Sequence, residues 1–97
     1  MMPLRFHPDT KLEISDSFQW YQAQSNGLGT KFIEELEDAF HSIQALPNTW
    51  PPMGKSHRRY ILSRFPYSVI YTLMNEQILV VAVMHNHRKP GYWLKRS

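Results

Sequence analysis

The spacing of apolar residues divides the first part of the chain into a strand and a helix. Residues 2–7 alternate apolar and polar side chains, which predicts a short first strand. Pro8 ends this strand, and Asp9 is a suitable N-cap for a helix that reaches about Gln24. An incomplete apolar stripe along this helix comprises Leu12, Ile14, Phe18 and Tyr21.

The following segment predicts a second helix. Asn26 and Gly27 both tolerate the left-handed conformation that ends a helix, so the first helix should stop there. Apolar residues then recur at spacings of three and four, at Leu28, Phe32, Leu36, Phe40 and Ile43. The second helix must end by Leu46, because Pro47 disfavours helical geometry in the residue before it. The short link between the helices predicts a helical hairpin.

The opposite face of the second helix is acidic. Its carboxylates belong to Glu34, Glu35, Glu37 and Asp38. Contiguous acids on a helix exterior are typical of a solvated surface, since side chains on that face do not meet other elements. We therefore interpret them as a solvated face rather than as a general acid–base group.

The second half of the chain predicts three strands. Residues 48–56 contain two prolines and a glycine and indicate a loop, and residues 57–65 predict a strand. Residues 67–74 are rich in β-branched and aromatic side chains, which predicts another strand. Asn75 and Glu76 fit a two-residue turn, and residues 78–84 are apolar on both faces, as in a central strand.

The predicted order is strand, helix, helix, strand, strand, strand. Each helix must bury its apolar stripe, and the sheet offers one face for that purpose. We therefore predict an α+β fold in which a helical hairpin packs on one face of a small, mainly antiparallel sheet. The other face should be left available. The length of 97 residues suits a single domain, 1–97.

Composition excludes several classes of protein. Hydrophobic residues make up 42% of the chain and charged residues 20%, which excludes wholesale disorder. The absence of cysteine excludes disulfides and thiolate metal sites. The N-terminal residues do not resemble a signal peptide, and no apolar run reaches transmembrane length. We expect a cytoplasmic protein without membrane contact.

The charge is divided between the two halves of the chain. Residues 1–50 carry three Lys or Arg against seven carboxylates, a net charge of −4, whereas residues 51–97 carry eight against Glu76 alone, a net charge of +7. Such a division predicts a basic surface that attracts nucleic acid or an acidic protein. The alternative is a solvated sheet edge and tail that simply carry cations.

Two features bear candidate chemistry. His85 and His87 alternate at the end of the last strand and could approach one metal, but a site needs a third ligand, and His57 is the only obvious one. We expect no metal and no cofactor. Basic residues that could clamp phosphate are Lys55, His57, Arg58, Arg59, Arg64, Arg88 and Lys89. Aromatic residues that could stack on bases are Tyr60, Tyr67, Tyr71, Tyr92 and Trp93, of which we expect Tyr71 to lie in the core.

Several blocks of the sequence resemble the RelE/ParE superfamily of bacterial type II toxins. They are GLGTKF (27–32), LPNTWPP (46–52), RRYILSRFPYSVIY (58–71) and ILVVAVMHNHRKPGYW (78–93), and the resemblance covers essentially the whole chain. It implies a small cytoplasmic toxin neutralised by a co-expressed antitoxin. RelE-like members cut messenger RNA in the ribosomal A site without a metal, whereas ParE-like members poison DNA gyrase and are not nucleases.

The residues that the RNA-cutting branch uses are only partly present. Matching positions retain a basic Arg59 and Arg88, but Ile61 stands where a second lysine is expected and Ser68 where an arginine is expected. Tyr92 follows Arg88 at a shorter spacing than in that branch. The PYS block and the HRKPGYW ending (87–93) look more like the ParE side.

The chemistry of RNA cleavage sharpens this comparison. Metal-free cleavage needs a base for the 2′-OH, an acid for the leaving oxygen and cations for the phosphorane. Arg59 and Arg88 supply cations, but arginine stays protonated and is a poor base. Proton transfer would then fall to a histidine with an unperturbed pKa of about 6.5, either His57, His85 or His87.

The leading hypothesis is a ParE-like toxin that inhibits gyrase by binding. The alternatives are a ribosome-dependent endoribonuclease and a relative that has lost its toxicity. We expect target and antitoxin contacts at Arg58, Arg59, Arg64, Arg88, Lys89, Tyr92 and Trp93. The expected antitoxin carries an acidic, partly disordered segment, and operator DNA should be bound only through it.

Overall fold

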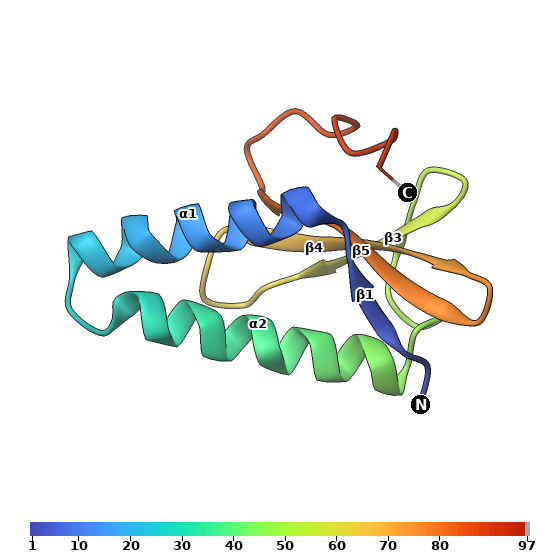
Figure 1. The fold of residues 1–97 in the computed structure, drawn as a ribbon, viewed down its shortest axis with the longest axis horizontal. Helices are drawn as coiled ribbons and strands as arrows, with labels where there is room; N and C mark the ends of the chain where they lie inside the picture. The colour runs from blue at the N-terminus through green and yellow to red at the C-terminus, as the bar shows by residue number, and fades with distance from the viewer. Residues whose placement is uncertain (97) are drawn as a thin grey trace.

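The computed structural model describes residues 1–96; Ser97, the last residue of the predicted domain, lies outside them. Two helices and five strands follow one another along the chain (Figure 1). Their bounds are β1 Leu4–Phe6, α1 Pro8–Gln24, α2 Leu28–Ala45, β2 Pro52–Met53, β3 His57–Ile61, β4 Tyr67–Met74 and β5 Gln77–His85. The helical hairpin lies along one side of the sheet, which confirms the predicted fold class.

The five strands form one sheet in the order β1-β5-β4-β3-β2. β1 runs parallel to β5, and all other neighbours are antiparallel. The predicted central strand is therefore correct, since β5 lies between β1 and β4. The two-residue strand β2 falls inside the segment predicted as a loop, because its backbone pairs with His57 and Arg58. Two residues are too few to leave a periodic pattern.

The start of α1 and the end of β3 differ from the predictions. Asp9 is not the N-cap of α1: His7 occupies that position, and its Nδ1 accepts a hydrogen bond from the Asp9 N–H at 3.1 Å. Pro8 thus begins the helix, where its missing N–H costs nothing. β3 ends at Ile61 rather than at residue 65, because the chain turns and Leu62 N–H bonds back to Tyr67 O at 3.0 Å.

The β4–β5 hairpin confirms the predicted two-residue turn. Asn75 and Glu76 both have positive φ, 51° and 60°, as the turns that match the twist of paired strands require. Ile70 pairs with Ala82 and Tyr71 with Val80, so Val81 is an extra residue that forms a bulge in β5. The bulge changes which β5 side chains face the helices from Val81 onward.

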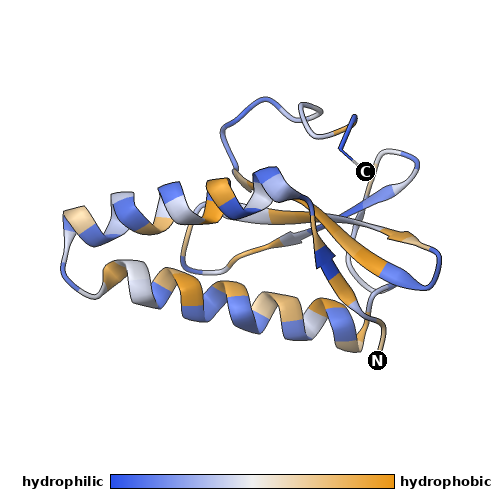
Figure 2. Ribbon diagram, viewed as in Figure 1, coloured by the Kyte–Doolittle hydropathy of each residue, from blue (hydrophilic) through white to orange (hydrophobic). Residues whose placement is uncertain are grey.

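The main core lies between the helices and the sheet. Its fully buried members come mainly from α2, β4 and β5. Apolar and polar segments alternate along both helices (Figure 2). The fully buried members include Phe32, Leu36, Ile43, Val69, Tyr71 and Val80. The predicted burial of Tyr71 is confirmed. Leu12 does not belong to the core stripe of α1, since it is 63% exposed, whereas Ile14 and Tyr21 face inward.

A second apolar cluster covers the opposite face of the sheet. It comprises Ile70, Val81, Ala82, Met84 and Trp93. The last of these comes from the C-terminal segment 86–96, which folds back beside the sheet and the start of α1 (Figure 1). The prediction that this face is left available is therefore wrong for its central part.

Candidate functional site

The C-terminal segment and α1 together complete the edge of β5. β1 pairs with β5 only as far as Val80, so the backbone of β5 beyond that point needs other partners. Val83 N–H donates to Glu13 Oε1 at 3.0 Å, and Arg96 Nη1 donates to Val81 O at 3.0 Å. Side chains from both ends of the chain thus replace a missing strand.

Glu13 also holds the C-terminal segment in place. Its Oε2 accepts from the Tyr92 hydroxyl at 2.7 Å and lies 3.1 Å from Arg96 Nη1 and 3.8 Å from Arg88 Nη1. The Arg88 guanidinium stacks on the Tyr92 ring, 3.5 Å from its centroid. Burial, and then the hydrogen bond and charge of Glu13, raise the pKa of Tyr92 above its ordinary value. Tyr92 is therefore a neutral donor at physiological pH.

The structure thus brings Arg88, Tyr92 and Glu13 together. Sequence reasoning missed Glu13, because an acid in the first turns of a helix is ordinary and its partners lie about seventy residues or more away. Arg88 keeps 53% of its side chain exposed, so it remains available to a partner.

A second polar cluster joins three strands on the face opposite the helices. Arg59 on β3 donates from Nε to Ser68 Oγ at 2.9 Å and from Nη2 to Asn86 Oδ1 at 3.2 Å. The Ser68 hydroxyl donates to the same Asn86 oxygen at 2.6 Å. Ser68 is fully buried. The position where the RNA-cutting branch carries an arginine is therefore occupied by a buried hydroxyl that holds Arg59.

The predicted basic residues do not converge on one site. Arg58 lies on the helix-facing side of β3 and donates to Trp50 O at 2.7 Å. Arg64 lies in the turn after β3, beside Glu35 of α2. Only Arg59, among these three, belongs to the face opposite the helices.

The three predicted histidines are divided between the faces of the sheet. His57 stacks against Trp93, with ring centroids 4.6 Å apart, and burial lowers its pKa. His85 contacts Tyr67 on the helix side and His87 beside it, at 5.2 Å in each case. Within residues 1–96, no three carboxylate or imidazole side chains are grouped as metal ligands.

The two aromatic residues of the C-terminal segment differ in exposure. Trp93 is only 3% exposed, so it belongs to the core, and the prediction that it could stack on bases is wrong. Its Nε1 is buried with no hydrogen-bond partner within the described residues. Tyr92 is half-buried through its contacts with Glu13 and Arg88.

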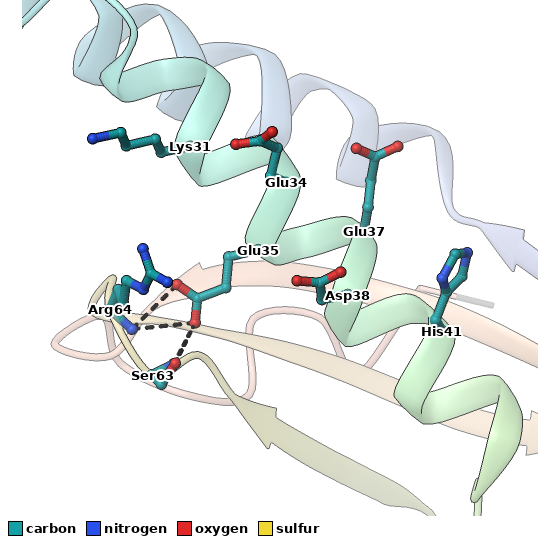
Figure 3. Close-up of a pocket in the computed structure, with 8 residues that line it drawn as sticks. All are labelled: Lys31, Glu34, Glu35, Glu37, Asp38, His41, Ser63 and Arg64. Atoms are coloured by element: carbon teal, nitrogen blue, oxygen red, sulfur yellow. Dashed lines mark hydrogen bonds between the residues drawn. The ribbon is translucent and has the colours of Figure 1, made fainter.

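The acidic surface of α2 borders a cleft of about 630 Å³. Figure 3 shows it between α2 and the turn after β3. Its lining residues are Lys31, Glu34, Glu35, Glu37, Asp38, His41, Ser63 and Arg64. Glu35 is not merely solvated: it is half-buried and accepts hydrogen bonds from the backbone N–H groups of Ser63 and Arg64 and from the Ser63 hydroxyl. This carboxylate fixes the turn that begins β4.

Glu35 should make stability depend on pH. Burial alone would raise the pKa of its carboxyl, but hydrogen bonds from Ser63 and Arg64 and the Arg64 charge lower it below 4.5. A depressed pKa stabilises the fold above the unfolded value, and this contribution is lost as pH falls through the folded value. We expect Glu35→Gln to lose less stability than the parent between about pH 5 and pH 3. Thermal unfolding at both pH values measures this, with exposed Glu34→Gln as the matched control; equal losses in all three would contradict the assignment.

Comparisons with known proteins agree with this architecture. The sequence pattern of a family described as "ParE toxin of type II toxin-antitoxin system, parDE" matches residues 4–90. The chain belongs to the ParE toxin family. Its membership confirms the resemblance to the RelE/ParE superfamily on the side that the PYS block favoured.

Individual relatives of this ParE family member support the same assignment. It is 27% identical over 89 residues to Toxin ParE2 of Mycobacterium tuberculosis, from strains CDC 1551 / Oshkosh and ATCC 25618 / H37Rv, covering 91% of this chain and 85% of the relative. The solved structure "Chromosomal ParDE TA system from P. aeruginosa" shares the fold, with a TM-score of 0.64 at 15% identity over 88% of this chain and 96% of that one. Neither helix of the described residues is both long and apolar enough to cross a membrane.

Proposed function

We propose that this ParE-family toxin stops growth by binding DNA gyrase in the cytoplasm, not by cutting RNA. The observation that supports this most is the burial and hydrogen bonding of Ser68. In the RNA-cutting branch that position carries an arginine, whereas here it is a buried hydroxyl bonded to Arg59 and Asn86. The neighbouring matched position, Ile61, is an aliphatic side chain that cannot transfer a proton.

The target-binding surface in this proposal is the part of the sheet face that the C-terminal segment leaves uncovered. Arg59 and Arg88 supply its positive charge, and Ile61, two residues after Arg59 on β3, is 56% exposed. Lys89 is exposed in the segment that follows β5. The Arg58 guanidinium donates to Trp50 O, and the exposed Arg64 lies beside α2, so we place both outside the target surface.

We further propose that a cognate antitoxin neutralises the toxin. The net charge of +7 on residues 51–97 complements an acidic, partly disordered segment that folds on binding. Operator DNA would then be contacted by the antitoxin. Rim charges of this kind mainly affect association rates, so raising the salt concentration should slow the formation of the complex.

Inducing the chain in bacteria tests the proposed target. We expect growth arrest with loss of plasmid supercoiling and gyrase-linked DNA breaks, and no new messenger RNA ends. Co-expression of the cognate antitoxin should restore growth. Arg59→Ala should weaken toxicity, whereas Lys31→Ala, a cation on the opposite side of the molecule, should not.

Two other results of the induction experiment would point to a different function. Codon-phased messenger RNA cuts with normal supercoiling would overturn the proposal in favour of a RelE-like nuclease. Unaffected growth despite accumulation of the folded chain would indicate a relative without toxicity.

A further inference from the structure

We infer that Arg59 is a pre-positioned binding site for a carboxylate that a partner protein presents next to an apolar side chain. Ser68 and Asn86 act as positioning residues for this site, and Ile61 is its apolar rim. The inference deepens the proposed function, on which it rests only for the identity of the partner. The preference for a carboxylate follows from the geometry of these residues.

The guanidinium of Arg59 is anchored on one side only. Arginine has five N–H donors in a rigid plane. Within the described residues, hydrogen bonds to Ser68 and Asn86 use donors on Nε and Nη2. These bonds fix the plane of the fork, while donors on Nη1 and Nη2 remain for a second planar acceptor.

Arg59 also lacks a counter-ion. Among residues 1–96, no carboxylate lies within ion-pair distance of it, whereas Arg88 and Arg96 both pair with Glu13. Arg59 is half-buried, and both of its acceptors are neutral. A partly desolvated charge without a counter-ion is unfavourable, so an incoming carboxylate regains electrostatic stabilisation that this chain does not supply.

The anchor is itself rigid. The Ser68 hydroxyl lies on β4 with no exposure, and Asn86 follows β5 directly. Their mutual hydrogen bond of 2.6 Å ties the two strands together beneath the Arg59 side chain. Because rotamers held by packing lose little entropy on binding, this arrangement favours a specific contact over a diffuse one.

The surroundings favour a protein carboxylate over a nucleic-acid phosphate. Binding to a nucleic-acid backbone draws on several cations that neutralise successive phosphates. Here the Arg58 guanidinium donates to Trp50 O on the helix side, and Arg64 lies in the turn beside α2. Arg88 faces Glu13, so none of the three reinforces Arg59. Ile61 lies on the same face two residues further along β3, and it is 56% exposed. A single fork beside an exposed aliphatic side chain fits an acidic residue adjacent to an apolar one.

The test uses the full chain and short synthetic peptides, without gyrase. Nitrogen-15 NMR follows the Arg59 Nε–H signal during titration with acetyl-Leu-Asp-Leu-Asp-Leu-amide, with the Asn analogue of that peptide, and with the dinucleotide UpU. We expect a saturable shift with the Asp peptide alone. Arg59→Lys keeps the charge but loses the fork, and should weaken binding about tenfold.

Positioning is tested by two further variants and a control. Ser68→Ala and Asn86→Ala should each weaken binding of the Asp peptide about fivefold, since one anchoring bond is lost. Each should also broaden the Arg59 Nε–H signal. Arg64→Ala should leave the peptide affinity and the Arg59 Nε–H signal unchanged. Asn86 is half-exposed, so its variant should keep its fold even if the buried Ser68 variant does not.

Two results would overturn the inference. One is an Arg59 Nε–H signal that does not shift with the Asp peptide, or that shifts equally with the Asn analogue. The other is tighter binding of UpU, which would assign the site to RNA. Because gyrase is absent, a failure here is distinct from a failure of the proposed target.

Discussion

Replacing Trp93 by alanine should lower the free energy of unfolding by about 3 kcal/mol or more. Trp93 is 3% exposed and completes the apolar cluster over β4 and β5. Its removal opens a large cavity and exposes Ile70, Met84 and their neighbours to water. The fold thus depends on a residue near the end of the chain.

Urea unfolding of matched variants measures this effect. Leu94→Ala is the control, because its side chain is next in sequence but 64% exposed, and it should change stability by less than about 0.5 kcal/mol. Trp93→Phe should cost less than Trp93→Ala, since it keeps a ring and removes the unpartnered Nε1–H. If Trp93→Ala were as stable as Leu94→Ala, the C-terminal segment would not belong to the core.

Replacing Glu13 by alanine should also cost about 3 kcal/mol. Its carboxylate is 13% exposed and serves the Val83 N–H, the Tyr92 hydroxyl and the Arg96 guanidinium. Without it, a backbone donor at the edge of β5 loses its partner, and the partly buried Arg96 loses its nearest carboxylate. Losses of this kind exceed those of surface ion pairs because water does not replace the missing group.

A double-mutant cycle isolates the part of this cost that belongs to the ion pair. Glu13→Ala and Arg96→Ala should be non-additive by at least about 1 kcal/mol, since the two side chains lie 3.1 Å apart. Asp16→Ala, an exposed acid on the same helix, should be near neutral. Full additivity at Glu13 and Arg96 would show that the pair does not hold the C-terminal segment.

Local patterns predicted the elements well where packing repeats along the chain. The stripe of α2 and the apolar run of β5 face a core over several turns or residues, so their periodicity or continuity is visible in sequence. The stripe of α1 is incomplete because Leu12 points outward and polar Thr10 is buried, where its hydroxyl donates to Val80 O. That contact depends on β5, which is distant in sequence.

The candidate site was less accessible to prediction for the same reason. Arg59 and Arg88 were identified by position within a resemblance, but their partners could not be. Asn86 lies 27 residues from Arg59, and Glu13 lies 79 residues from Tyr92. No local pattern encodes such pairs. The sheet register that brings Ser68 beside Arg59 has to be known first.

The most direct test of gyrase binding is the supercoiling of relaxed plasmid DNA by purified gyrase in the presence of the folded chain. If the chain binds gyrase through Arg59, we expect inhibition that rises with toxin concentration, weakens in Arg59→Lys and persists in Arg64→Ala. Normal supercoiling at a large molar excess of a chain that still arrests growth would contradict it.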